Sequence, residues 1–227
     1  MRVINAVMMS FESKRFSQLA CWLVVALNVL VLAACGKESV RATPLPAGAV
    51  VLVVGDSLVA GTGAPAGSDW PRALGETAGW NVVNAGVPGD TAAAALTRLP
   101  ALLDAHRPDA VIIAVGGNDF LRNVSANATR ESLEQLLNRS LEATSHVALL
   151  GVPSVSLARA VVGGLADDSL FSEIARERDV LLISGAIAEV LSSADLRSDR
   201  IHANARGYEV LAQRVFDALA EAGWVRW

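Results

Sequence analysis

Residues 50–57 read Val-Val-Leu-Val-Val-Gly-Asp-Ser, and this stretch decides the fold. Its first five residues are apolar at every position, which is typical of a short strand that is buried on both faces. Four similar runs follow, at residues 81–84, 110–115, 147–152 and 180–183. Each run is too short for a helix and is bounded by Gly, Pro or Asp. Strands of this kind indicate a parallel sheet with helices on both sides.

Helical stretches lie between the strand-like runs. We expect them to begin at or near Pro71, Asp90 or Thr91, Thr129, Asp167 and Asn204, which are residue types that favour helix N-termini. The alternation predicts an α/β protein, a three-layer α/β/α sandwich with a central parallel five-stranded sheet. Ligands of such sheets bind beyond the carboxyl ends of the strands. Functional residues are therefore expected at those ends.

Length and composition limit the function classes. The chain has 227 residues, and a domain of about 150 residues leaves room for one domain and an extension. Hydrophobic residues make up 52% and charged residues 19%, so the chain can form a packed core and is not a disordered protein. The net charge of −4 supplies no basic field for nucleic acid, and we expect no nucleic-acid partner.

The N-terminus has the pattern of a secretory signal. Lys14 and Arg15 precede an apolar run from Leu19 to Ala34, and Cys35 follows. The residues before Cys35 resemble the lipobox of bacterial lipoproteins, in which this cysteine is lipidated and becomes the new N-terminus. We therefore interpret residues 1–34 as a lipoprotein signal peptide, 35–48 as a tether and 49–227 as the globular domain. The alternative is an uncleaved segment that spans the membrane once.

The lipobox resemblance also predicts a location. Gly36 rather than Asp follows Cys35, which is similar to the sorting pattern for the outer membrane of Gram-negative bacteria. We expect a protein of the bacterial cell envelope that is anchored on the periplasmic side through lipidated Cys35, with the membrane as its partner. Cys21 is removed with the signal peptide, and Cys35, the one cysteine that remains, is used for lipidation. The sequence therefore argues against disulfides and against cysteine metal sites in the mature protein.

Four motifs follow the predicted strands. Ser57 stands at a strand-to-helix turn, where backbone amides stabilise an anion, although an ordinary N-cap serine fits there too. A glycine block at 84–91 can expose a backbone N–H. Asn118 can direct its amide at an oxyanion or serve only as a turn residue. Asp199 precedes His202 by three residues, a spacing that lets Asp199 accept from Nδ1 and leaves Nε2 free as a base.

In this order, the four motifs resemble the GDSL or SGNH hydrolase family, specifically its bacterial thioesterase I, lysophospholipase and arylesterase branch. The resemblance spans roughly residues 50–215 and implies the flavodoxin-like fold of that family. It makes Ser57 the nucleophile, His202 the base and Asp199 the residue that orients it. It also implies an oxyanion hole formed by the N–H groups of Ser57 and Gly89 and by the Asn118 side chain.

Two positions depart from the family pattern or leave a choice. Gly86 competes with Gly89 for the oxyanion role, and we prefer Gly89 because it directly precedes Asp90-Thr91 at a helix start. The family usually continues His-Pro-Asn, whereas Ala203 stands in place of the proline here. Asp56 and Asp119 are interpreted as structural carboxylates that hold the loops.

These residues predict a serine esterase that cleaves small acyl esters or thioesters through an acyl-serine intermediate. Neither a metal nor an organic cofactor is expected, because His106 and His146 lack partners at ligand spacing. Two alternatives are a carbohydrate O-deacetylase of envelope polysaccharide and a non-catalytic binding lipoprotein. A non-catalytic protein would be expected to have lost Ser57, Asn118 or His202.

The long apolar segment from Pro153 to Gly164 begins at the end of the fourth strand-like run. Loops of this length in a compact domain are often functional. We therefore expect Pro153, Leu157 and Val161 to line a groove for the acyl chain. The alternative is a loop that packs on the sheet edge without contacting substrate.

Overall fold

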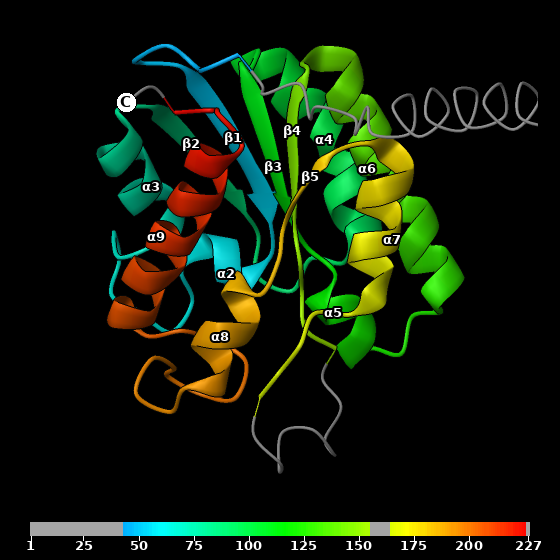
Figure 1. Cartoon of the computed structure of the whole chain (residues 1–227). Helices are drawn as coiled ribbons and strands as arrows, with labels where there is room; N and C mark the ends of the chain where they lie inside the picture. The colour runs from blue at the N-terminus through cyan, green and yellow to red at the C-terminus, as the bar shows by residue number, and fades with distance from the viewer. Residues whose placement is uncertain (1–42, 155–163, 226–227) are drawn as a thin grey trace, which may run out of the picture. The chain divides into compact units, whose positions relative to one another are not determined.

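The strands form a single parallel sheet (Figure 1). The computed structural model describes residues 43–154 and 164–225. Its strands are β1 (Val50–Gly55), β2 (Asn81–Gly86), β3 (Ala110–Ala114), β4 (His146–Leu150) and β5 (Leu181–Ile183). They pair in the order β2-β1-β3-β4-β5, and every pairing is parallel. The predicted sheet is confirmed.

The burial of each strand depends on its place in the sheet. All five residues of the central strand β3 are buried, as are the last five residues of β1. The edge strands β2 and β5 each have only one buried residue. A central strand needs apolar side chains on both faces, since helices cover both. This is why the β1 and β3 sequences lack the polar alternation of a half-exposed strand.

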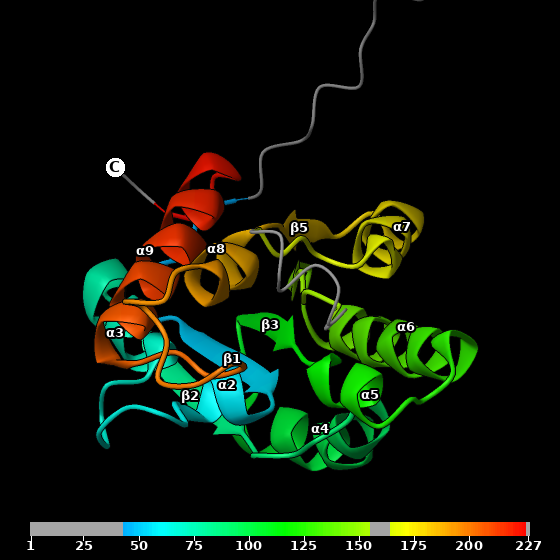
Figure 2. The ribbon, with the colours of Figure 1, turned by 90° about the horizontal axis from the view of Figure 1, so that it is seen from below.

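The helices lie in two layers (Figure 2). They are α2 (Ser57–Ala60), α3 (Trp70–Ala78), α4 (Ala92–His106), α5 (Gly117–Leu121), α6 (Ala126–Ala143), α7 (Ser169–Arg178), α8 (Ala186–Ser192) and α9 (Ala205–Glu221). Helices α3, α8 and α9 pack together on one face of the sheet, and α4, α6 and α7 pack on the other. The three-layer α/β/α sandwich is confirmed, with the core on both sides of β1 and β3.

Most helix starts agree with the sequence, but the start of α6 differs and that of α7 lies one residue later than predicted. Thr91 and Asn204 cap α4 and α9 as predicted. Thr129 does not cap α6, because Ser125 accepts the hydrogen bond of the N-terminal turn instead. Thr129 is fully buried one turn later and donates its hydroxyl to Asp119. The short helices α5 and α8 were not predicted, since they contain too few residues to show a helical period.

Residues 43–48, which the sequence assigns to the tether, already contact the domain. The Leu45 side chain is 6% exposed, and its N–H donates to the carbonyl of Trp224. The carbonyl of Thr43 lies 2.7 Å from His146 Nε2. The packed part of the chain therefore begins before Ala49. No helix within the described ranges has the length and apolar character needed to cross a bilayer.

Candidate active site

The loops that follow β1, β2 and β3 meet at one edge of the sheet (Figure 1). The chain leaves β1 for β2 on one side and later returns to place β3 on the other side of β1. Such a reversal opens a crevice at the carboxyl ends of the two strands. Ser57 follows β1 directly and Asn118 lies in α5 after β3, so this crossover brings two predicted site residues to the same place.

Ser57, His202 and Asp199 form a connected set. His202 Nε2 lies 3.0 Å from Ser57 Oγ, and His202 Nδ1 lies 2.8 Å from Asp199 Oδ2. The His202 side chain is 16% exposed, whereas that of Asp199 is 54% exposed. A base within hydrogen-bond reach of a hydroxyl, itself oriented by a carboxylate, is the arrangement that activates a nucleophilic serine. The structure thus joins residues 145 positions apart in the chain.

Asp199 is held by its own turn. Its Oδ1 accepts the backbone N–H groups of Ile201 and His202, each over 2.8 Å. Desolvation acts to raise the pKa of Asp199, but hydrogen bonds from the His202 side chain and from these N–H groups outweigh it and lower the pKa. Asp199 therefore remains ionised and keeps His202 in the tautomer that carries the proton on Nδ1.

The turn after His202 is closed without a proline. Ala203 is fully buried and forms an isolated bridge with Arg197. Ser198 N–H donates to the His202 carbonyl over 2.9 Å. These contacts fix the backbone on both sides of His202, so the replacement of proline by Ala203 leaves the histidine in place.

The two candidate glycines differ in their surroundings. Gly86 N–H donates to Asn84 Oδ1, and a methyl group at Gly86 would lie 2.3 Å from the backbone nitrogen of Ala60. Gly89 has a positive φ of 86°, and its N–H has no partner among the described residues. Among the described residues, a methyl group at Gly89 would meet only Arg122 Nη2, at 3.3 Å. Gly86 thus lets α2 pack closely, while Gly89 keeps its N–H available.

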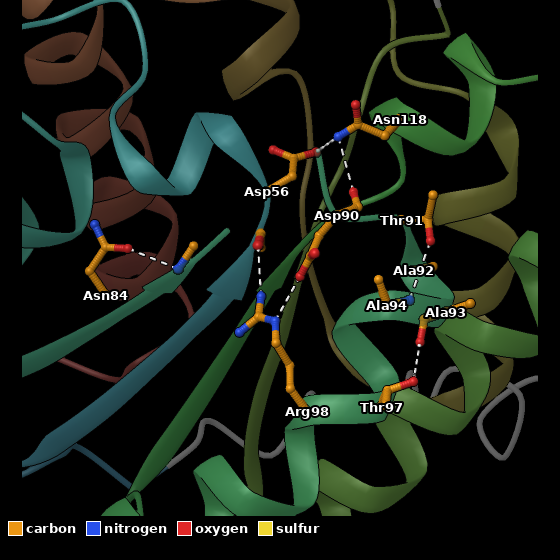
Figure 3. Close-up of polar contacts among 12 residues, drawn as sticks. Asp56, Asn84, Asp90, Thr91, Ala92, Ala93, Ala94, Thr97, Arg98 and Asn118 are labelled. Atoms are coloured by element: carbon orange, nitrogen blue, oxygen red, sulfur yellow. Dashed lines mark hydrogen bonds and ion pairs between the residues drawn. The ribbon is translucent and has the colours of Figure 1, made fainter. Parts of the chain in front are cut away.

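Asn118 connects the loops that follow β1 and β2 (Figure 3). Its Nδ2 donates to Asp56 Oδ2 over 3.3 Å and to the carbonyl of Asp90 over 3.0 Å. Asp56 also accepts the Leu58 N–H and so caps α2. Burial raises the pKa of Asp56 to about 6, although the Leu58 hydrogen bond acts to lower it. Asn118 thereby lies with its amide nitrogen at the junction of the two loops.

Asp119 is a second buried carboxylate, and its partners lie in α4 and α6. It is 1% exposed, and it accepts the N–H of Ala92 at the start of α4 and the hydroxyl of Thr129 in α6. Burial raises the pKa of Asp119, and these hydrogen bonds partly oppose the rise. Its contacts fasten α5 to α4 and α6, which fits a structural role.

Arg98 is a residue near the site to which the sequence analysis gave no role. It reaches from α4 to the carboxylate of Asp90 and to the carbonyl of Gly55 (Figure 3). One signal was present in the chain, because Arg98 is the only charged residue between Asp90 and Asp104. A lone arginine in an apolar helix usually has a specific partner.

The predicted acyl groove lies partly outside the described residues. Pro153 is buried and forms an isolated bridge with Asp167. Leu157 and Val161 belong to residues 155–163, which lie outside the described ranges, as does Cys35. Asp168 caps α7, one residue later than predicted, because Asp167 instead accepts the N–H of Gly185.

Comparison with known proteins agrees with this geometry. Residues 53–210 match the GDSL-like lipase/acylhydrolase family. The chain belongs to that family. The matched range extends from β1 into α9 and includes Ser57, Asn118 and His202.

Relatives within the GDSL-like family are esterases and thioesterases by name. Thioesterase 1/protease 1/lysophospholipase L1 of Escherichia coli K12 is 34% identical over 160 residues, which cover 68% of this chain and 75% of that protein. Esterase TesA of Pseudomonas aeruginosa is 35% identical over 131 residues, or 56% of this chain and 65% of that protein. The crystal structure of TesA superposes with a TM-score of 0.68 at 26% identity and covers 76% of this chain and 99% of that one.

The family membership and these relatives establish the class of reaction. The chain is an enzyme, a serine hydrolase of the GDSL-like family that acts on ester bonds. They do not favour the polysaccharide O-deacetylase or the non-catalytic lipoprotein. Within the described residues, no group of three His, Cys, Asp or Glu side chains is arranged to hold a metal ion.

Proposed function

We propose that Ser57 attacks the ester carbonyl, that His202 is the general base and that Asp199 orients His202. The observation that carries the proposal is the chain of contacts from Ser57 Oγ to His202 Nε2 at 3.0 Å and from His202 Nδ1 to Asp199 Oδ2 at 2.8 Å. In this arrangement the Ser57 proton passes to His202 Nε2 as Oγ bonds to the carbonyl carbon. Asp199 stabilises the imidazolium that forms.

The reaction then divides into two halves around an acyl-Ser57 intermediate. His202 returns its proton to the leaving alcohol or thiol as the first tetrahedral intermediate collapses. Water next attacks the acyl group while His202 accepts one of its protons. Collapse of the second intermediate releases the carboxylic acid and restores the Ser57 hydroxyl.

Three donors would hold the negative oxygen of each tetrahedral intermediate. They are the N–H groups of Ser57 and Gly89 and the Nδ2 of Asn118. The proposal is supported by the Gly89 N–H, which has no partner among the described residues, and by the position of Asn118 Nδ2 between the loops after β1 and β2. Both N–H bonds of Asn118 Nδ2 are donated in this structure, so Asn118 would exchange its longer contact, the one of 3.3 Å to Asp56 Oδ2, for the oxyanion. Backbone N–H donors that are fixed before the charge develops need little reorganisation, and one oxyanion donor can contribute about 10²- to 10³-fold in rate.

The substrates are proposed to be acyl esters and thioesters. The name of the Escherichia coli relative, which includes thioesterase 1 and lysophospholipase L1, supports this substrate class. Pro153, Leu157 and Val161 are proposed to line the acyl groove, since Pro153 follows β4 at the same sheet edge as Ser57. Lipidated Cys35 would anchor the enzyme to the bacterial cell envelope on the periplasmic side of the outer membrane.

A fluorophosphonate that carries a reporter tests the site directly. We expect stoichiometric, irreversible loss of ester hydrolysis and modification of one peptide, the one that contains Ser57. The Ser57→Ala variant should neither react nor turn over substrate. Modification of another serine in the parent enzyme, with Ser57 untouched, would overturn the assignment.

A further inference from the structure

Arg98, in α4, contacts both the end of β1 and the loop that follows β2. From the second turn of α4, its Nε donates to Asp90 Oδ2 over 2.7 Å and its Nη2 donates to the Gly55 carbonyl over 2.9 Å (Figure 3). Asp90 directly follows Gly89, and Gly55 is separated from Ser57 by one residue. One planar guanidinium thus holds the Gly89 loop against the end of β1, the strand that precedes the proposed nucleophile.

The contacts of Asp90 extend the link to the third donor. The side chain of Asp90 is occupied by Arg98, while its backbone carbonyl accepts the amide of Asn118 over 3.0 Å. The Gly55 carbonyl accepts a second hydrogen bond from the N–H of Val87, which lies in the Gly89 loop. Arg98 is therefore connected to all three groups proposed to bind the oxyanion.

Helix capping does not account for the Asp90–Arg98 pair. Thr91 accepts the N–H of Ala94 as the N-cap of α4, and Asp119 accepts the N–H of Ala92. Asp90 and Arg98 are also eight residues apart, beyond the spacing of three or four at which side chains meet on one helix face. The pair joins a loop to a helix rather than stabilising the helix itself.

The pair is also partly shielded from water. The side chains of Arg98 and Asp90 are 24% and 13% exposed. A contact in such a place has lower mobility and less screening than a surface ion pair. The geometry and burial of the pair are therefore suited to fixing the distance between the Gly89 loop and the end of β1.

We propose that Arg98 is a positioning residue for ester hydrolysis, which sets the separation between the Gly89 N–H, the Asn118 amide and Ser57 by holding the loop at 86–91 to the end of β1. The inference rests on the proposed roles of these three residues. Arg98 itself touches no reacting atom. Its loss would displace donors that act on the transition state and leave the binding of the neutral substrate largely unchanged.

The test compares Arg98→Gln and Arg98→Lys in the full-length enzyme. We expect Arg98→Gln to lower kcat by about 10- to 100-fold with KM changed less than about twofold, as for a small displacement of catalytic groups. Lysine keeps the charge but lacks the planar fork that reaches both acceptors, so Arg98→Lys should recover only part of the loss. Asp90→Asn combined with Arg98→Gln should cost little more than either change alone.

Arg72 offers a matched control in the same protein. It also donates to one carboxylate and one glycine carbonyl, those of Glu76 and Gly67, but its side chain is 60% exposed. Arg72→Gln should leave kcat and KM unchanged.

A transition-state analogue separates positioning from simple loss of structure. Affinity for a trifluoromethyl ketone that adds reversibly to the serine should fall in proportion to kcat/KM across the Arg98 variants. The proposal is overturned if folded Arg98→Gln keeps the parent kcat, or if analogue affinity stays unchanged while kcat/KM falls. If Ser57→Ala remains active, the proposed function fails instead, so the two failures are distinguishable.

Discussion

Asn118 Nδ2 donates over 3.3 Å to Asp56 Oδ2, and Asp56 is only 4% exposed. The same carboxylate caps α2 through the N–H of Leu58. Asp56, which directly precedes Ser57, thus links helix α2 to the Asn118 side chain in α5. This contact places an ionisable group behind the oxyanion donors, where water cannot stabilise its charge.

Asp56 should make stability depend on pH. Burial raises its pKa from 3.8 to about 6, so the folded protein binds more protons than the unfolded chain between these values. The associated stability is fully present below about pH 3.8 and is lost as the pH rises through about 6, with a total of about 3 kcal/mol. In Asp56→Asn this loss should be absent. Denaturant unfolding of both proteins at pH 4 and pH 7.5 measures it.

In the comparison of the parent with Asp56→Asn, the contributions of the other buried carboxylates to the pH dependence of stability cancel. Asp119 and Asp167 also have raised pKa values because of burial, but they titrate in both proteins. The variant should gain stability relative to the parent as the pH rises from 4 to 7.5. A constant difference between the two proteins over this range would contradict the buried, ionising Asp56.

Ser57 and His202 should act as one unit. Ser57→Ala and His202→Ala should each lower kcat by at least about 10³-fold, and the double variant should lose little more, because either change alone removes the activated hydroxyl. Steady-state hydrolysis of an activated ester checks this. Losses that multiply in the double variant would show that the two residues act independently.

Substitution by alanine should have different effects at Gly89 and at Gly86. Gly89→Ala strains a backbone with φ of 86°, at a cost of about 1–2 kcal/mol, and it should lower kcat by disturbing the N–H direction. Gly86→Ala would push a methyl group to within 2.3 Å of the Ala60 nitrogen, so it should chiefly destabilise the fold. Thermal unfolding and kcat measured side by side separate them. If Gly86→Ala lost more kcat than Gly89→Ala for the same loss of stability, Gly86 rather than Gly89 would be the oxyanion donor.

The acyl groove can be tested by chain length. Because each methylene buried in an apolar groove contributes up to about 0.8 kcal/mol, the Leu157→Ala and Val161→Ala changes together should reduce kcat/KM for medium-chain esters more than for acetate esters. A p-nitrophenyl ester series from acetate to decanoate provides the measurement. Equal reduction at every chain length would mean that residues 153–164 support the fold and do not contact the acyl chain.

Cys35 can be tested apart from catalysis. In a Gram-negative host, Cys35→Ser should block lipidation and signal cleavage, because the sulfur that receives the lipid is missing. Mass spectrometry and membrane fractionation should then show an unprocessed chain in place of a lipidated one. Identical mass and fractionation for both proteins would refute the anchor, whatever the esterase activity.

Local patterns in the chain were enough to predict much of the fold and the site. The apolar run at 50–54 required a strand covered on both faces, and the same pattern at 110–115 required a second. The spacing of Asp199 and His202 predicted their contact, because a side chain three residues away in a turn is within reach whatever the rest of the fold does. Ser57 and Asn118 were singled out because each lies shortly after a predicted strand, and the resemblance to the GDSL family gave them their predicted roles.

Only the tertiary structure decided which distant groups touch. The sequence favoured Gly89 over Gly86 only through its place before a helix start, whereas the difference in their contacts lies in the helix that packs on Gly86 and in the partner of the Gly86 N–H. It gave Thr129 the role of a cap, because a threonine near a helix start looks the same whether its hydroxyl meets a backbone N–H or a buried carboxylate.

The contacts of Arg98 show most clearly why sequence alone does not predict which distant groups touch. Its acceptor, the carbonyl of Gly55, is 43 residues away in the chain and is a backbone atom, so no residue type marks it. The contact exists because β1 lies between β2 and β3 and α4 crosses beside it. The sequence determines which segments are strands and helices through local burial and capping, whereas packing of the sheet and helices determines which backbone groups come within reach of a side chain.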